Sequence, residues 1–273
     1  MSGQEAADGR AAVKIDTSKP HPARMYDWFL GGKDNYPVDE EMAAQLLKIE
    51  PRGRELARVN RAFMHRAVRW LAGQGIRQYL DIGTGIPTEP NLHQIAQQAA
   101  PESRVVYCDN DPIVLAHAEA LLRSTPEGVT EYIQADARHP EVILEHAGKF
   151  LDFDKPIALS MLALLHFISD EDGAYELVDR LVEQLAPGSY VVLSQTTGDF
   201  NPGGADAAME VYKARGLVLA LRTRAQVERF FHGLEIVEPG VSLTAEWHPE
   251  LGEPVPVTGD EPIPGYAVVA RKP

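Results

Sequence analysis

Short apolar runs alternate with segments of helical periodicity between residues 78 and 195. Each run is long enough for a buried strand, and apolar residues in the intervening segments recur three or four positions apart, as on one face of a helix. Strands that alternate with helices indicate βαβ units, right-handed crossovers and a mostly parallel sheet. The five predicted strands span residues 79–82, 104–108, 129–134, 157–161 and 190–195.

The pattern before residue 76 has no such alternation. Residues 1–19 are polar and small and lack a periodic apolar face, so we expect a disordered arm. Residues 23–36 are rich in aromatic side chains and predict a short helix followed by a turn, and two longer helical patterns come after it. We therefore divide the chain into the arm (1–19), an N-terminal helical cap or lid (20–75) and the sheet-containing domain (76–273).

The pattern after residue 196 is less regular. A loop rich in Gly and Pro precedes a short helical segment, and Thr223 with Gln226 has the pattern of a capping box for a further helix. Three later apolar runs predict closing strands at residues 234–237, 241–245 and 267–270.

Composition restricts the partners of the protein. The 273 residues include 26 Lys and Arg against 40 Asp and Glu, a formal net charge of −14. Nucleic-acid binding depends on cationic contacts, so we expect no nucleic-acid partner. The longest apolar stretch, residues 157–168, is too short to cross a bilayer, and Cys108 has no second cysteine to pair with. We therefore expect a cytoplasmic protein with no membrane association.

The first predicted strand ends in a glycine-rich turn at residues 81–85 (DIGTG). Glycines let the backbone approach a ligand closely, and the helix that follows offers free N–H groups. Ligands of parallel sheets bind outside the carboxyl ends of the strands. A dinucleotide site begins in the same way, but Thr88 stands where the third glycine of that fingerprint belongs. An NAD(P)-dependent oxidoreductase is therefore the weaker alternative.

Acidic residues follow the next two predicted strands. Asp109 is placed to accept hydrogen bonds from both hydroxyls of a ribose, and Asp111 is the competing candidate, which also suits a helix N-cap. Asp136 can accept from an adenine amine while the N–H of Ala137 donates to a ring nitrogen; alternatively, Asp136 only stabilises a turn. Because these features fall at successive strand ends, together they indicate a nucleoside site more strongly than any one of them does.

These motifs resemble those of a known class of enzymes. Residues 78–194 resemble the class I S-adenosylmethionine-dependent methyltransferases, and segments 23–39 (ARMYDWFLGGKDNYPVD), 81–93 (DIGTGIPTEPNLH) and 222–240 (RTRAQVERFFHGLEIVEPG) are similar to an actinobacterial family of S-adenosyl methyltransferases formerly classed as a domain of unknown function. The resemblance implies a Rossmann-like α/β fold with a mostly parallel seven-stranded sheet, helices on both faces and an N-terminal helical cap. It also implies S-adenosyl-L-methionine as cofactor and S-adenosyl-L-homocysteine as product.

The resemblance assigns positions around the methionine and ribose parts of this cofactor. Gly83, Thr84 and Gly85 would pass under the methionine part, with Asp81 nearby. Asp109 would hold the ribose.

The remaining assignments concern the adenine and the reacting methyl group. Asn110 would flank the adenine, and Asp136 with Ala137 would read its edge. Ser160 and Met161, at the end of the fourth strand, would lie near the methyl group. The sequence here lacks the Asn/Asp-Pro-Pro-aromatic motif of many N-methyltransferases, so methylation of an amide or adenine nitrogen by that motif is not supported.

The aromatic N-terminal segment is the expected lid. Methyl transfer from a sulfonium requires in-line approach and exclusion of water. Tyr26, Trp28 and Tyr36 would supply an aromatic wall that stabilises the cation, and Asn35 a polar contact to the substrate. Alternatively, these aromatic side chains only pack an extra helix against the sheet.

One histidine is a candidate general base. His166 follows the apolar fourth strand and could accept a proton from the acceptor, although a single histidine in an apolar stretch is more commonly a core residue. The other histidines and Cys108 have no metal-ligand spacing, so we expect no metal.

These features predict a methyltransferase that acts on a small-molecule acceptor. The alternative of another class is a non-catalytic sensor or scaffold that binds S-adenosylmethionine without transferring its methyl group. The identity of the acceptor, its reacting atom and the oligomeric state stay open.

Overall fold

The computed structural model describes residues 15–121 and 123–273, and eight strands in these ranges form one sheet. Residues 1–14 of the expected arm lie outside the described residues. The strands are β1 (Gln78–Ile82), β2 (Arg104–Asp109), β3 (Val129–Gln134), β4 (Ala158–Leu162), β5 (Tyr190–Thr196), β6 (Glu235–Ile236), β7 (Ser242–Leu243) and β8 (Gly265–Arg271).

The spatial order of the strands is β3-β2-β1-β4-β5-β8-β6, and β7 pairs with β8. β1 to β5 run parallel, as the alternating pattern predicted, and β8 is antiparallel to β5. β6 and β7 pair with different parts of the same edge of β8, at Ala270–Arg271 and Tyr266–Ala267 respectively. The sheet is therefore seven strands wide although it contains eight.

The strand order creates the crevice in which a ligand of such a sheet binds. From β1 the chain continues to β2 and β3 on one side of β1, and then returns to place β4 and β5 on the other side. Loops that leave neighbouring parallel strands in opposite directions open a crevice at their carboxyl ends. The crevice of this sheet therefore lies at the ends of β1 and β4.

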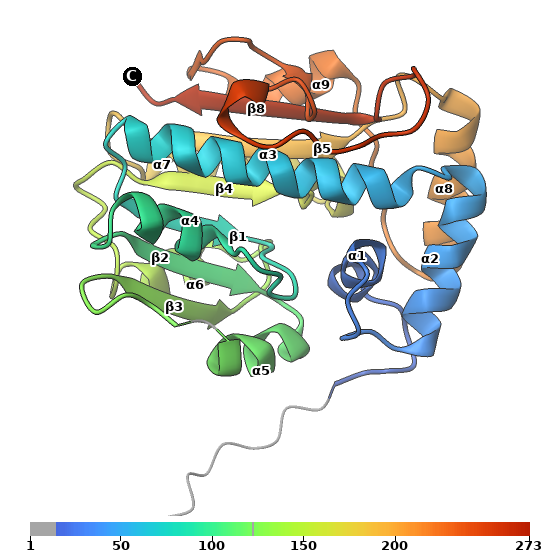
Figure 1. Cartoon of the computed structure of the whole chain (residues 1–273), viewed down its shortest axis with the longest axis horizontal. Coiled ribbons are helices and arrows are strands. Elements are labelled where there is room, and N and C mark those ends of the chain that lie inside the picture. Colours follow the sequence, from blue (N-terminus) through green and yellow to red (C-terminus); the bar gives the residue numbers. More distant parts are fainter. Residues whose placement is uncertain (1–14, 122) are drawn as a thin grey trace, which may run out of the picture.

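Helices cover both faces of the sheet (Figure 1). Tyr79 packs into a cluster with residues of α3 (Gly53–Gly73) and α4 (Leu92–Ala99), whereas Leu80 packs on the opposite side with residues of α6 (Pro140–Ala147) and α7 (Ala174–Glu183). This opposition of successive side chains is the period of two of a strand. The remaining α-helices are α1 (Pro22–Leu30), α2 (Pro37–Ile49), α5 (Pro112–Leu121), α8 (Pro202–Ala214) and α9 (Arg224–Glu228).

The residues of the expected cap divide between two locations. α3 packs along the sheet through buried side chains such as Phe63 and Leu71. Figure 1 shows α1 beyond the carboxyl ends of the strands. Helix α2 lies further from the sheet than α1, next to α8. Within the expected cap, α1 and α2 therefore lie beyond the strand ends, whereas most of α3 lies along the sheet.

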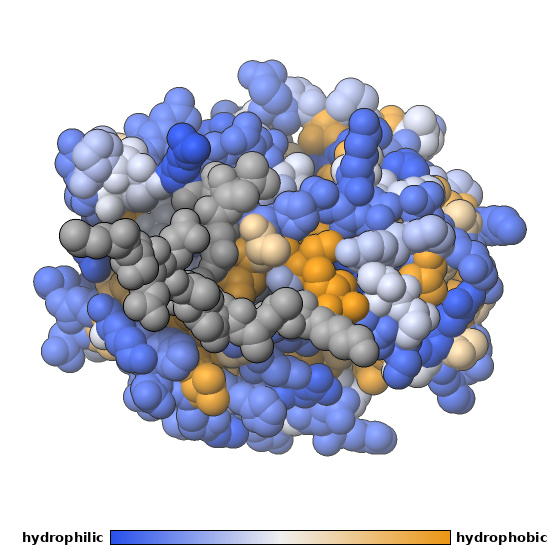
Figure 2. Space-filling model, turned by 90° about the horizontal axis from the view of Figure 1, so that it is seen from below, coloured by the Kyte–Doolittle hydropathy of each residue, from blue (hydrophilic) through white to orange (hydrophobic). Residues whose placement is uncertain are grey.

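The surface is mainly hydrophilic on the face seen from below, with apolar residues near its centre (Figure 2). Four large apolar side chains of the described residues are exposed, namely Val142, Phe200, Val218 and Val257. No helix in the described ranges is long and apolar enough to cross a membrane.

A buried ion-pair network attaches α1 to the sheet. The Arg24 Nε lies 3.2 Å from a carboxylate oxygen of Asp111, which follows β2, and Arg24 Nη1 lies 3.6 Å from Asp39 at the start of α2. All three residues are buried. Asp39 also accepts hydrogen bonds from the backbone N–H groups of His21 and Tyr36. Because charges in such a site need partners, the network fixes α1 above the end of β2.

The network should make a large contribution to stability. Replacing Arg24 with Met leaves two buried carboxylates without their cation, so we expect the free energy of unfolding to fall by about 3–5 kcal/mol. The matched control is Lys213→Met, which removes the exposed ion pair with Glu210 and should cost less than about 1 kcal/mol. Urea unfolding measures both, and equal losses would show that the network does not hold the cap.

Candidate functional site

A cavity of about 580 Å³ lies at the carboxyl ends of the strands, and α1 contributes to its wall. This volume is within the usual range for small-molecule sites, roughly 300–1,000 Å³. Its lining includes residues that follow β1, β2, β3, β4 and β5, together with side chains of α1, α2, α3 and α8. The strand ends that carry the predicted nucleoside motifs therefore meet in one cavity.

The bend after β1 depends on two glycines in the left-handed region of the backbone. Gly83 has φ of 75° and Gly85 has φ of 68°. A Cβ atom on Gly83 would lie 2.7 Å from Leu164 Cδ1 and 3.1 Å from Leu164 Cβ, whereas a Cβ on Gly85 would meet nothing within 4 Å. Gly83 therefore allows both the turn and the close approach of the loop after β4.

Asp109 joins this bend to the end of β2. One oxygen of its carboxylate accepts a hydrogen bond from Gly85 N–H at 2.8 Å, and the other accepts from Asp111 N–H at 3.0 Å. Burial raises the pKa of Asp109, and the two N–H donors oppose this shift. The side chain lines the cavity, and each oxygen retains a lone pair for a further donor. Asn110, the next residue, also lines the cavity.

The residues that follow β3 include a carboxylate that is already paired. Asp136 and Ala137 line the cavity. Arg138 donates to both carboxylate oxygens of Asp136, at 2.6 Å for the shortest contact, and these bonds lower the pKa of Asp136. Asp136 is therefore ionised and already paired, and a ligand would compete with Arg138 or bind beside it.

The carboxylate of Asp81 lies deeper, between β1 and β4. Burial raises its pKa to about 6, while a hydrogen bond from the Ser160 hydroxyl acts in the opposite direction. Ser160 therefore supports Asp81 and does not line the cavity, and the side chain of Met161 is fully buried in the core. The residues that line the cavity after β4 are Leu162, Ala163 and Leu164.

Of the four residues expected in the lid, Tyr26 alone lines the cavity. The ring of Trp28 lies 4.0 Å from the Arg54 guanidinium carbon, and Asn35 donates to Asp27 at 2.8 Å. Tyr36 packs against an apolar cluster around Ile113. Trp28 and Tyr36 therefore pack within the protein, as the alternative for the aromatic side chains proposed. Asn35 bonds to Asp27, and Tyr26 lines the cavity.

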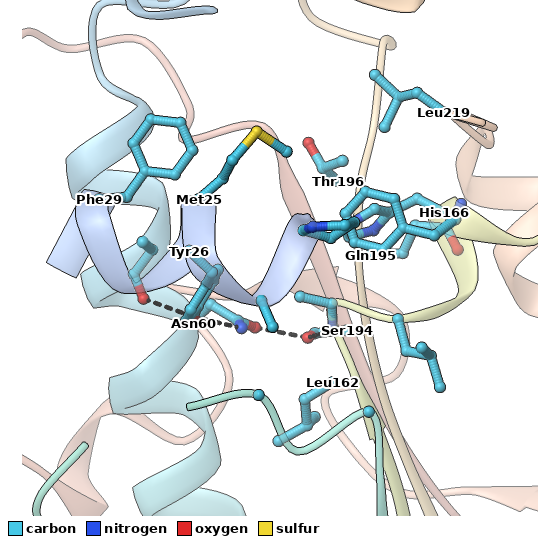
Figure 3. A pocket seen from close by; sticks show the side chains of 18 of the residues that line it. Met25, Tyr26, Phe29, Asn60, Leu162, His166, Ser194, Gln195, Thr196 and Leu219 are labelled. Atoms are coloured by element: carbon cyan, nitrogen blue, oxygen red, sulfur yellow. Dashed lines mark hydrogen bonds between the residues drawn. The ribbon is translucent and has the colours of Figure 1, made fainter. Parts of the chain in front are cut away.

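A chain of hydrogen bonds crosses from α1 to β5 beside the cavity (Figure 3). The Tyr26 hydroxyl donates to Ala57 O at 3.0 Å and accepts from Asn60 Nδ2 at 2.9 Å. Asn60 Oδ1 in turn accepts from the hydroxyl of Ser194. Sequence reasoning missed Asn60 and Ser194, although a lone amide beside the apolar residues of the segment that forms α3 was a usable signal.

Ser194 also controls the backbone after β4. Its hydroxyl accepts from Ala163 N–H at 3.0 Å, and Ala163 has φ of 53°, which is unusual for a residue other than glycine. This conformation directs the chain so that Leu164 reaches Gly83. A strained position of this kind at a cavity wall is typical of functional sites.

His166 lies in the short 3₁₀ helix Leu165–Phe167 and lines the cavity. It is buried, and its Nδ1 has no hydrogen-bond partner among the described residues. Burial and the nearby Arg222 guanidinium lower its pKa to about 3. The imidazole is therefore neutral at neutral pH, which leaves one nitrogen as an acceptor and the other as a donor.

The strand order, the glycine bend and the carboxylates at three neighbouring strand ends define a class I S-adenosylmethionine-dependent methyltransferase. The chain belongs to the S-adenosyl methyltransferase family, whose sequence profile matches residues 8–273. S-adenosyl-L-methionine is the cofactor of this family. The comparison with curated proteins gave no match.

Solved structures agree with this assignment. A DUF574 family protein from Streptomyces avermitilis is 47% identical, with a TM-score of 0.90 over 95% of this chain and 100% of its own. A Thermobifida fusca protein assigned to the methyltransferases is 39% identical, with a TM-score of 0.85 over 94% of this chain and 96% of its own. The plantazolicin methyltransferase BpumL, crystallised with S-adenosylhomocysteine, shares the fold at 12% identity and a TM-score of 0.54, over 92% and 95% of the two chains.

The close approach at Gly83 leads to a matched test. Gly83→Ala and Gly85→Ala both place a side chain at positive φ, which costs about 1–2 kcal/mol of unfolding free energy. Gly83→Ala should lose a further 1–3 kcal/mol, roughly, because its Cβ overlaps Leu164. Adding Leu164→Ala should recover part of this extra loss. Chemical denaturation measures all four proteins, and equal losses for the two single variants would contradict the contact.

The low pKa of His166 predicts a pH dependence of stability. Between its folded value of about 3 and its ordinary value near 6.5, the unfolded chain binds a proton that the folded protein does not. Stability should therefore fall as the pH is lowered, by about 2 kcal/mol from this group between pH 7 and 5. His166→Gln should show a smaller decrease over this range, and since all other groups are shared, identical slopes would refute the shift.

Proposed function

We propose that this methyltransferase acts on a small-molecule acceptor and binds S-adenosylmethionine across the ends of β1, β2 and β3. The observation that carries the proposal is the convergence of Gly83, Asp109 and Asp136 on one cavity. In this arrangement the glycine bend lies under the methionine part, Asp109 accepts from the ribose hydroxyls, and Asp136 with Ala137 faces the adenine.

The charge of the cavity suits this cofactor. S-adenosylmethionine carries a sulfonium and an ammonium group, and opposite charges attract strongly where water is excluded. Asp81 and Asp109 are buried carboxylates at the bend. With a pKa of about 6, Asp81 is ionised at neutral pH and supplies negative charge near the methionine ammonium. Asp109 gains ribose hydroxyl donors, which stabilise its ionised form further.

Two features favour a small acceptor. The protein has a net charge of −14, which repels a nucleic-acid backbone. Helix α1 forms part of the cavity wall, and Tyr26 connects this helix to α3 and β5 through the Asn60–Ser194 chain. A cavity of this size with α1 in its wall admits a small molecule more readily than a folded macromolecule.

The ribose contact provides the test of the cofactor site. Asp109→Ala removes the carboxylate, so we expect S-adenosylhomocysteine affinity to fall at least about tenfold by calorimetry, as the loss of hydrogen bonds to a charged group predicts. Asp109→Asn keeps an oxygen that can accept from Gly85 N–H, and separates the loss of charge from loss of the bend. The control is Asp206→Ala, which removes an exposed carboxylate on α8 and should leave affinity unchanged.

Two outcomes would overturn this proposal. Unchanged affinity in a folded Asp109→Ala protein would mean that another residue holds the ribose. Tight binding of NAD together with no binding of S-adenosylmethionine would place a different nucleotide in the cavity.

A further inference from the structure

One part of the cavity wall is apolar and comes from elements outside the nucleoside motifs. Its side chains belong to α1, α2, α8, the loop after β4 and the segment 216–221. They form one packed cluster, in which Phe167 and Tyr212 rings lie 5.9 Å apart. Figure 3 shows Met25, Phe29 and Leu219 on this side, with His166 nearby. We call this set the apolar wall, and it consists of Met25, Phe29, Leu46, Phe167, Tyr212 and Leu219.

No side chain of the apolar wall itself is charged, and two charged residues elsewhere in the lining, Glu50 and Arg61, already bond to groups of the protein. Glu50 forms an ion pair with Arg52 Nε at 3.3 Å. Arg61 donates to the backbone carbonyls of Thr88 and Pro90. A charged group placed against the apolar wall would lose its hydration, and no side chain of the wall offers it a counter-charge, so an uncharged acceptor fits the wall better.

Most polar groups beside the wall are also satisfied. Tyr26, Asn60 and Ser194 bond to one another in the chain described above. Gln195 donates to Ala220 O at 3.2 Å and accepts from Arg222 at 3.3 Å. His166 differs from these groups, because its Nδ1 is buried and has no partner among the residues that the structure describes. Thr244 Oγ1, also in the lining, is in the same state, and an unpaired polar group in a cavity lining is one that a ligand can satisfy.

The position of His166 is fixed by the backbone on both sides. Arg222 donates to the carbonyls of Leu165 and Ile168, at 2.7 and 2.8 Å, and forms an ion pair with Asp170 at 2.6 Å. The carbonyl of His166 itself accepts from Ala220 N–H at 2.7 Å. These bonds fix the backbone that carries the imidazole, and its ring packs against the Phe167 ring with 4.2 Å between centroids.

We propose that the acceptor is an uncharged aromatic alcohol or phenol, that the apolar wall binds its ring, and that His166 bonds to its hydroxyl and takes the proton released on methylation. This inference rests on the proposed function. A ligand hydroxyl can donate its proton to the acceptor nitrogen of the neutral imidazole, which places that proton on the base. The flat, apolar part of the ligand matches the aromatic side chains Phe29, Phe167 and Tyr212.

The transfer step is balanced within this arrangement. A lone pair of the hydroxyl oxygen forms a bond to the methyl carbon as the carbon–sulfur bond breaks, and its electrons stay on sulfur to give the thioether S-adenosylhomocysteine. The hydroxyl proton passes to the imidazole nitrogen of His166 and later to water. The hydroxyl proton becomes strongly acidic as the oxygen–carbon bond forms. A weakly basic imidazole can therefore accept it.

Three probes with the same ring system test the acceptor class. Wild-type protein saturated with S-adenosylhomocysteine is titrated with 5-indanol, 5-aminoindane and indane-5-carboxylate, and each is then offered with S-adenosylmethionine. We expect 5-indanol to bind at least about tenfold more tightly than the carboxylate, because the latter buries a charge. We also expect 5-indanol to give the methyl ether with release of S-adenosylhomocysteine.

Two variants separate binding from proton transfer. His166→Gln keeps a donor and an acceptor, so KM for 5-indanol should change little while kcat falls about 10²–10⁴-fold, the usual size of a general-base contribution. His166→Phe should also weaken binding of 5-indanol. Both should bind S-adenosylmethionine as the wild type does.

The outcomes distinguish failure of the acceptor assignment from failure of the proposed function. The inference is overturned if the amine or the carboxylate is bound or methylated as well as 5-indanol, if none of the three is methylated by a protein that binds S-adenosylmethionine, or if His166→Phe transfers at the wild-type rate. Failure of the wild type to bind S-adenosylmethionine would instead overturn the proposed function.

Discussion

The carboxylate of Asp109 holds together the part of the molecule on which the site depends. It accepts from Gly85 N–H across the gap between β1 and β2, and so fixes the glycine bend against the neighbouring strand end. The same bend leaves room for Leu164, which arrives from β4 because Ala163 adopts a left-handed conformation. These contacts fix the ends of β1, β2 and β4 relative to one another. A buried carboxylate normally destabilises a fold, and here two backbone N–H donors offset part of that cost.

The cap is attached by a different kind of interaction. Arg24 connects α1 to Asp111 after β2 and to Asp39 at the start of α2. Asp111 lies two residues from Asp109, and its N–H donates to the Asp109 carboxylate. The attachment of the cap and the proposed ribose contact are therefore linked through one short segment. The apolar wall that α1 and α2 help to form is positioned by the same attachment.

Much of the fold could be predicted from the sequence, because it depends on local periodicity. The five parallel strands, the glycine bend and the acidic strand ends were each visible as patterns, and the structure brings the strand ends into one cavity. Contacts between distant segments were not visible in this way. The placement of Ser160 behind Asp81, the burial of Met161 and the packing of Trp28 by Arg54 all depend on tertiary neighbours that periodicity does not encode. The contact between Asn60 and Ser194 was missed for the same reason, since the two residues are 134 positions apart in the sequence.

The central claim is that three neighbouring strand ends hold one nucleoside over the glycine bend. A crystal structure of the complex with S-adenosylhomocysteine tests it most directly. The account predicts both ribose hydroxyls within hydrogen-bond distance of the Asp109 carboxylate, about 2.5–3.0 Å, and the adenine beside Asp136. Adenosine bound elsewhere, or a ribose that makes no contact with Asp109, would contradict it.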